Sequence, residues 1–192
     1  MSARHGWLTF TGDGQPLARR LDSAVGSWQE VLLGEHRAWY GDSAPEQVSG
    51  AFVLQYLLQV PAHTAAVAAG LGLRCTALAD LSFALGDHGE PRRVEIGPVA
   101  ALAGDLDQRL ATAERDYLAA TVPVAQAYRS TRPMSTQQRL GMVHDMWAEA
   151  RRAVRSSAGL FTLDEPRRRS CCLIYALPGC VECSGCPRRR RA

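Results

Sequence analysis

Five of the chain's six cysteines lie within 16 consecutive residues near the C-terminus, and this cluster constrains the fold more than any other feature of the sequence. The clustered cysteines are Cys171, Cys172, Cys180, Cys183 and Cys186. A chain of 192 residues buries enough surface to fold without cross-links. The cluster therefore predicts a chemical role for the thiols rather than a need for structural staples.

The sequence favours a cytoplasmic protein, in which clustered thiols are more often metal ligands than disulfides. Residues 1–10 have Arg4 and His5 but no apolar run of signal-peptide length after them. The least polar stretch, residues 48–73, is interrupted by polar residues and Pro61, and we expect it to fall short of the segment that a membrane span needs.

Positive charge is concentrated at the C-terminal end. All 22 basic residues are arginine, and residues 167–192 contain seven of them against one acid, Glu182, for a local charge of +6. The other 166 residues contain 15 arginines and 18 acids, for a charge of −3. The chain is thus predicted to have a mildly acidic body and a basic tail.

The body is predicted to be mainly helical. Amphipathic periodicity predicts a helix over residues 15–40. A second begins near Asp42 or Ser43, with Pro45 near its first position, is interrupted at Pro61, and is followed by a helical piece to Ala69. Two longer helices are predicted over residues 104–128, with a kink at Pro123, and 135–157, where Ser135 and Gln138 have the spacing of a capping box.

A short β-hairpin interrupts this helical pattern. Apolar and polar residues alternate in 81–85 and again in 94–96, with a polar turn over 86–89. The predicted fold class is α+β and helix-dominated, with a helical body and central hairpin over residues 1–165. Residues 166–192 form the second predicted unit, a C-terminal cysteine-rich segment.

The spacing of the clustered cysteines is typical of a metal site. In Cys183-Ser-Gly-Cys186 two intervening residues allow a tight turn that brings both sulfurs to one metal, and Gly185 gives that turn its backbone freedom. An apolar segment and a Pro178-Gly179 turn return a second pair, Cys171 and Cys172, to it. This CC-x10-CxxC pattern suits zinc or an iron–sulfur cluster.

The adjacency of Cys171 and Cys172 favours an iron–sulfur cluster over zinc. Neighbouring side chains of an extended segment diverge, so both bind one small ion only if the backbone bends sharply. A two-iron cluster accepts sulfurs from an irregular backbone more readily. Spacing alone leaves the role of Cys180 open, because it forms an overlapping CxxC with Cys183. Cys75, amid leucines, is predicted to be a buried apolar cysteine.

The pattern, preceded by arginines and containing Leu-Ile-Tyr-Ala-Leu-Pro-Gly at 173–179, resembles the C-terminal [2Fe-2S] signature of the FhuF-type ferric-siderophore reductases. The resemblance implies that Cys171, Cys172, Cys183 and Cys186 hold the cluster and that Cys180 does not. It further implies one-electron reduction of siderophore-bound iron(III), with the body as the siderophore-binding scaffold. No dinucleotide fingerprint follows a predicted strand, so an external flavoprotein or ferredoxin is the expected donor.

The tail arginines allow two interpretations. Beside an anionic cluster they act as counter-charges, for which Arg167, Arg168 and Arg169 are the better candidates, whereas residues 188–191 suit a solvated terminus. The alternative is a four-cysteine zinc-binding module whose basic tail binds nucleic acid. The low aromatic content of 7%, with only Tyr175 near the tail, makes nucleic acid the less favoured partner.

Outside the cluster, few residues suggest chemistry. His144 and Asp145 on the last helix can face a substrate, although a surface or core histidine is the commoner case. Trp147 is predicted to lie in the core. The sequence contains no nucleophile–base constellation that predicts hydrolysis.

Overall fold

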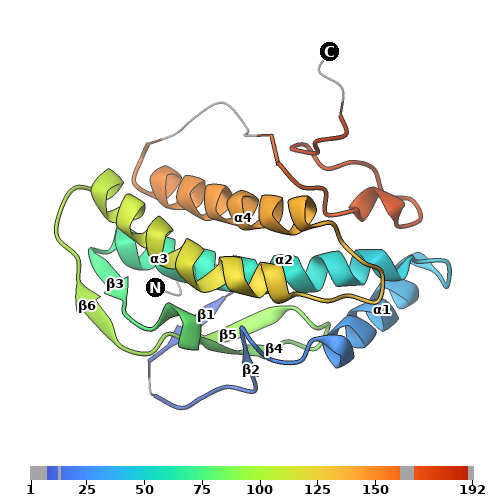
Figure 1. Cartoon of the computed structure of the whole chain (residues 1–192), viewed down its shortest axis with the longest axis horizontal. Helices are drawn as coiled ribbons and strands as arrows, with labels where there is room; N and C mark the ends of the chain where they lie inside the picture. The colour runs from blue at the N-terminus through green and yellow to red at the C-terminus, as the bar shows by residue number, and fades with distance from the viewer. Residues whose placement is uncertain (1–7, 13, 161–166, 190–192) are drawn as a thin grey trace.

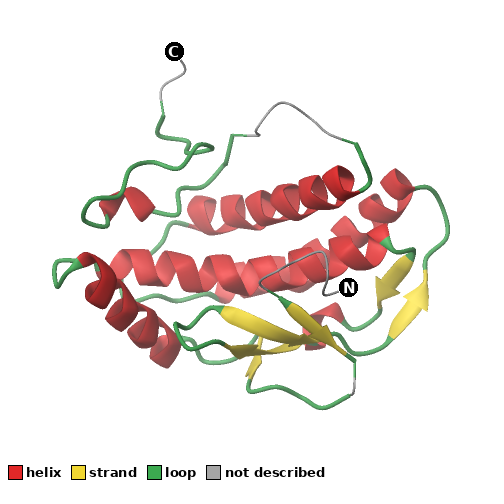
Figure 2. Cartoon of the chain, turned by 180° about the vertical axis from the view of Figure 1, so that it is seen from behind, coloured by secondary structure: helices red, strands yellow, loops and turns green. Residues whose placement is uncertain are grey.

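A computed structural model describes residues 8–12, 14–160 and 167–189. Helix α2 (Glu46–Gly70) runs through the middle of the molecule and packs against α1 (Gly26–Tyr40), α3 (Leu106–Ala127) and α4 (Thr136–Ser157). Two small sheets lie on one side of this helical layer, and the C-terminal segment runs over α4 on the other side (Figures 1 and 2). The predicted helix-dominated α+β class is confirmed.

The larger sheet has the strand order β1-β5-β4-β2. Strands β4 (Ser82–Leu85) and β5 (Pro91–Glu95) are antiparallel and form the predicted hairpin. Strand β1 (Thr9–Thr11) pairs in parallel with β5, and β2 (Arg19–Arg20) pairs antiparallel with β4. These two strands were not predicted, because two or three residues are too few to show a period.

A second sheet and two short 3-10 helices complete the fold. Strands β3 (Leu73–Cys75) and β6 (Val99–Ala101) pair antiparallel. Helix η2 (Leu78–Asp80) follows β3, and η3 (Ile174–Ala176) lies in the C-terminal segment. The boundary predicted between body and tail, after residue 165, lies outside the described residues.

Two predicted helix boundaries are wrong. The first helix begins at Gly26, not near residue 15, because Arg19 and Arg20 are used as a strand. Helix α2 continues through Pro61 to Gly70 without interruption. Pro61 cannot donate a backbone hydrogen bond, but it is buried, and packing on both sides of it stabilises the helix more than the lost bond weakens it.

The two long helices lie close to their predicted positions. Ser135 caps α4, because its hydroxyl oxygen accepts a hydrogen bond of 3.1 Å from the Gln138 N–H. Helix α3 has a complete capping box formed by Asp105 and Gln108, which was not predicted. Pro123 lies inside α3, and the helix continues past it to Ala127.

Helix α2 is apolar because it is the core helix. Residues 47–73 contain no Asp, Glu, Lys or Arg, so the stretch meets a length and composition test for a membrane span that we expected it to fail. Within the fold, however, 78% of its most apolar window is buried. A helix that is apolar on all faces belongs in a core as readily as in a bilayer.

Aromatic side chains join the elements around α2. The Trp28 indole N–H donates to the Gly89 carbonyl at 2.7 Å and ties α1 to the hairpin turn. The Tyr117 hydroxyl donates to the Val143 carbonyl at 2.9 Å, and its ring stacks on Trp147, which is 3% exposed. The predicted core position of Trp147 is therefore confirmed, and α3 and α4 are fixed to each other.

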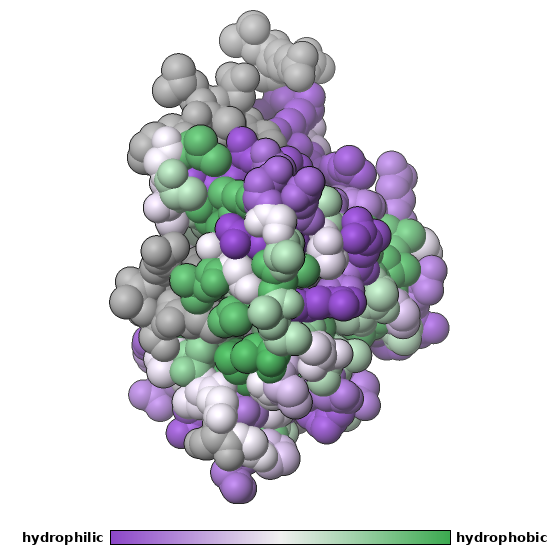
Figure 3. Space-filling model, turned by 90° about the vertical axis from the view of Figure 1, so that its left-hand side faces the viewer, coloured by the Kyte–Doolittle hydropathy of each residue, from purple (hydrophilic) through white to green (hydrophobic). Residues whose placement is uncertain are grey.

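Apolar side chains also gather on the end face where α2 and α4 finish and β6 lies (Figure 3). Leu71, Val99 and Leu160 are the large exposed apolar residues of these chain segments, each between 43% and 47% exposed. This end lies opposite the loop between α1 and α2 (Figure 1).

Candidate metal centre

The C-terminal segment is attached to α4 through the buried carboxylate of Asp145. The backbone N–H groups of Arg169 and Ser170 donate to its two oxygens at 2.7 and 2.8 Å, and the Ser170 hydroxyl donates to it as well. The Arg168 guanidinium lies 3.6 Å from the same carboxylate. Asp145 therefore fixes the three residues that precede the first clustered cysteine. This anchoring role was not predicted from the sequence.

Two further residues of α4 hold the segment close to the helix. The Gln138 side-chain amide donates to the Cys171 carbonyl at 3.0 Å. A Cβ on Gly141 would lie 3.3 Å from the Ser170 Cβ and 3.4 Å from the Arg169 carbonyl carbon. Only glycine allows this approach without displacement, so the helix-interior glycine is explained by the chain that crosses it.

The segment also folds back on itself. The Arg168 N–H donates to the Gly185 carbonyl at 2.9 Å. The Arg167 guanidinium donates to the carbonyls of Pro187 and Arg189. These bonds close a loop, so that the residues fixed by Asp145 lie beside the CxxC turn.

A sharp backbone bend follows Cys172. Leu173 has φ 64° and ψ 10°, the left-handed conformation, and no other non-glycine residue of the described chain has positive φ. This conformation costs a residue with a side chain about 1 kcal/mol. The CxxC turn is closed by a 3.0 Å bond from the Cys186 N–H to the Cys183 carbonyl. Strain of this kind concentrates at functional sites.

The four predicted ligand sulfurs meet as two pairs. The Sγ atoms of Cys171 and Cys186 are 4.0 Å apart, and the thiols of Cys172 and Cys183 lie near enough to each other for Cys172 to raise the pKa of Cys183. Cys171 and Cys172 thus join different pairs, as expected for neighbouring side chains that diverge. Cys172 and Cys186 are buried, and Cys171 and Cys183 are half-buried.

Cys180 and Cys75 have other surroundings. Cys180 is half-buried and packs against the small apolar cluster of Ala44, Val48 and Leu177. Cys75 is 5% exposed in the core of the body, where burial raises the pKa of its thiol to about 11. Cys75 is therefore the buried apolar cysteine that the sequence predicted. The exclusion of Cys180 from the ligands stays a prediction.

The donor set fits a centre of two metal ions. Tetrahedral bonds of about 2.3 Å to sulfur separate two ligand sulfurs by about 3.8 Å, close to the distance between Cys171 and Cys186. No group of three or more His, Cys, Asp or Glu side chains in the described chain is arranged around one ion position. Two contacting pairs are the arrangement that two irons, each with two cysteines, require.

Burial and neighbouring charge set the pKa of the Cys171 and Cys183 thiols. Burial raises the pKa of both Cys171 and Cys183, and the nearby cysteines raise it further. The Arg168 guanidinium opposes this at Cys183, because positive charge stabilises a thiolate. Metal binding replaces the thiol protons, so Arg168 assists the state in which the sulfurs bind metal.

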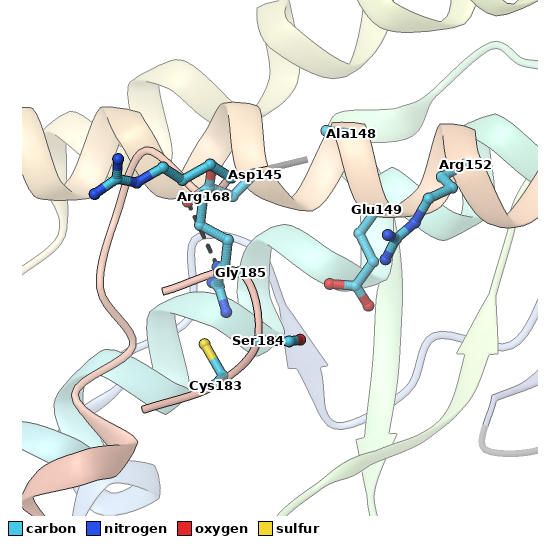
Figure 4. A pocket seen from close by; sticks show the side chains of 9 residues that line it. Asp145, Ala148, Glu149, Arg152, Arg168, Cys183, Ser184 and Gly185 are labelled. Atoms are coloured by element: carbon cyan, nitrogen blue, oxygen red, sulfur yellow. Dashed lines mark ion pairs between the residues drawn. The ribbon is translucent and has the colours of Figure 1, made fainter. Parts of the chain in front are cut away.

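A hollow of about 170 Å³ lies between α4 and the C-terminal segment. It is lined by Asp145, Ala148, Glu149, Arg152, Arg167, Arg168, Cys183, Ser184 and Gly185. Glu149 and Arg152 project from α4 toward the chain that contains Cys183 and Ser184 (Figure 4). One predicted cluster ligand is thus part of the wall of a polar hollow.

Residues 168–188 match the family model described as the FhuF 2Fe-2S C-terminal domain. The C-terminal segment is therefore similar to the iron–sulfur domain of FhuF proteins. The matched residues include Arg168 and all five clustered cysteines, and the domain indicates a [2Fe-2S] cluster as cofactor. The resemblance stated from the sequence is therefore confirmed. No curated protein and no solved structure matches the chain.

Proposed function

We propose that the protein is a cytoplasmic ferric-siderophore reductase. It would transfer one electron to iron(III) in an imported chelate, and the iron would leave as iron(II). The match of residues 168–188 to the FhuF 2Fe-2S C-terminal domain carries this proposal, and the pairing of the four predicted ligand sulfurs supports it.

The chemistry of the substrate explains why one electron is sufficient. Siderophore oxygens are hard ligands, which bind iron(III) tightly and iron(II) weakly. A bound [2Fe-2S] cluster supplies one electron at a time. The donor that restores this electron is an external flavoprotein or ferredoxin.

The residues of the chain have three tasks in this proposal. The four cysteines hold the cluster, and Asp145 and Gln138 hold the cysteine-bearing backbone on α4. Arg168 lies against both Asp145 and the Cys183 thiol. Its positive charge favours the more negative, reduced state and so raises the reduction potential.

The contacts of the tail support this function over a zinc module that binds nucleic acid. Tyr175 is the aromatic residue nearest to the basic tail, and the Arg188 guanidinium lies 4.4 Å from its ring centroid. One face of the ring is therefore in a cation–π contact within the chain. The solvated terminus considered for residues 188–191 falls partly outside the described residues, which end at Arg189.

The experiment is anaerobic purification followed by iron and sulfide analysis, visible spectroscopy and EPR. We expect two irons and two sulfides per chain and an EPR signal only after reduction. Mixing the reduced protein with a ferric siderophore in the presence of an iron(II) indicator should then bleach the signal and give one iron(II) per chain. A colourless protein with one zinc and no sulfide would contradict the proposal.

A further inference from the structure

The hollow beside Cys183 combines a ligand sulfur with three arginines. Arg152 comes from α4, and Arg167 and Arg168 come from the start of the C-terminal segment. Cys183, which is half-buried, forms part of the same wall. A group bound here would lie beside the exposed side of the centre. Because the rate of electron transfer falls steeply with distance, this is a favourable position for an electron acceptor.

The two acids of the hollow are engaged within the body. Asp145 is 7% exposed and receives the backbone and hydroxyl hydrogen bonds from Arg169 and Ser170. Glu149 accepts a hydrogen bond of 3.1 Å from the Gln59 amide, and the nearby His63, 3.8 Å away, is the largest cause that lowers the pKa of its carboxyl group. The Asp145 carboxylate is thus occupied by the segment, whereas the Glu149 side chain is held by Gln59 and stays 41% exposed in the wall of the hollow.

The arginines of the hollow are only partly neutralised by carboxylates. The Arg167 guanidinium donates to the carbonyls of Pro187 and Arg189, which carry no net charge. Arg168 lies between Asp145 and the Gln55 amide oxygen, 3.2 Å from the latter. With Arg152, the walls have three positive charges and two negative ones. The walls therefore have a net charge of +1, which lowers the repulsion that an anionic iron–sulfur centre exerts on an approaching anion.

We propose that this hollow binds the anionic oxygens of the ferric chelate, carboxylate or catecholate, and that Arg152 and Arg167 hold them beside Cys183. This inference rests on the proposed function. A volume of about 170 Å³ is smaller than the roughly 300–1,000 Å³ of a site for a complete drug-sized ligand. The hollow thus accommodates one arm of the chelate, and the remainder lies outside.

The proposed step is balanced as a single electron transfer. The reduced protein loses one electron, and the iron(III) of the docked chelate gains it and becomes iron(II). No bond to the protein forms or breaks. The arginines neutralise the chelate oxygens and so allow a negative complex to approach the anionic centre.

The test compares Arg152→Gln with Arg151→Gln, its exposed neighbour, which does not line the hollow. Each dithionite-reduced holoprotein is mixed in a stopped-flow instrument with an anionic ferric citrate complex, a neutral cyclic tris-hydroxamate complex and a cationic linear tris-hydroxamate complex. In Arg152→Gln we expect the rate constant for the anionic complex to fall about three- to tenfold. The neutral complex should change less than twofold, and Arg151→Gln should match wild type.

A second variant keeps the proposal testable if Arg152→Gln fails to retain its cluster. Ala148→Glu adds a negative charge to the wall of the hollow without removing a contact of the segment. It should slow the anionic complex selectively, and its EPR spectrum should match that of wild type. Added salt should reduce the wild-type preference for the anionic complex.

The outcomes separate the two proposals. If the wild-type protein reduces all three complexes and neither variant changes their relative rates, the docking site is wrong and the reductase function stands. If a protein with an intact cluster reduces none of the complexes, the proposed function is wrong, and the docking site fails with it.

Discussion

The helical body and the C-terminal segment are held together by different forces. In the body, nearly the whole of α2 is buried, and the core extends from Leu8 to Val154. The segment from residue 167 to 189 packs Leu177 on the small cluster of Ala44 and Val48, and polar bonds fix it to α4, most of them to Asp145 and Gln138. Apolar burial scales with area, whereas polar anchors act through single groups. The body should therefore tolerate changes that the segment does not.

The largest expected effect is loss of the cluster in Cys183→Ser. A serine hydroxyl replaces a predicted ligand sulfur, and we expect the visible absorption and EPR signal to be lost or greatly weakened. The circular dichroism of the body should stay helical, because a body of this size folds without metal. Cys180→Ser is the control and should keep the spectrum; the reverse result would overturn the ligand assignment.

The next effect is expected for Asp145→Asn. The amide presents two N–H donors where the segment also presents donors, and it leaves the Arg168 guanidinium without its carboxylate. Breaking a buried charged contact of this kind costs about 2–4 kcal/mol. We expect cluster loss under a chelator to be at least tenfold faster than in wild type. His144→Gln, one residue earlier on α4, serves as the control; equal loss from both variants would argue against the anchor.

Gly141→Ala should have opposite effects on the two regions, with the body made more stable and the C-terminal segment less firmly held. Within α4, alanine is favoured over glycine by up to about 1 kcal/mol, so the body should be slightly more stable to urea. The new Cβ, however, would lie 3.3 Å from the Ser170 Cβ and push the segment outward. We expect faster cluster loss together with an unchanged or higher unfolding midpoint. A lower midpoint with normal cluster retention would contradict this.

The smallest effect is the pH dependence that comes from Glu149. The contact with His63, whose Nε2 lies 3.8 Å from the Glu149 carboxylate, is the main cause that lowers the pKa of this carboxyl group in the folded protein. Its stabilising contribution is therefore present above the pKa of the unfolded chain and is lost as pH falls through the folded value, below about 4.5. Because the side chain is 41% exposed, the contribution is well under 1 kcal/mol.

This pH dependence is measured by urea unfolding of the cluster-free protein between pH 3 and pH 6. Glu149→Gln should flatten the stability curve at the acidic end relative to wild type. Glu114→Gln, on α3, is the control. A wild-type protein that gains stability relative to Glu149→Gln as the pH falls would show that the pKa shift has the opposite sign.

Sequence patterns predicted the long elements well and the short ones poorly. The hairpin of β4 and β5 and the helices α3 and α4 were found because their periods extend over enough residues to exceed local noise. Strands β1, β2, β3 and β6 have two or three residues each and were missed. Pro61 misled the prediction of α2, because its local effect is overcome by burial along the whole helix.

The chemistry of the centre was determined by the sequence alone. The identity and spacing of Cys171, Cys172, Cys183 and Cys186 predict a sulfur-ligated centre, because a CxxC turn is a local geometry that few residues define. The resemblance of the surrounding residues added the two-iron cluster, and the match of residues 168–188 confirmed it. The arginine content of the tail was equally visible in the sequence.

Only the tertiary structure decided which groups meet. The contact of Cys171 with Cys186, the anchoring of Arg169 and Ser170 by Asp145, and the hollow beside Cys183 all join residues 15 or more positions apart. No local period encodes such contacts, because they follow from how α4 packs on α2 and where the chain returns across it. The sequence therefore determined what the centre is made of, and the packing determined what holds it and where it opens.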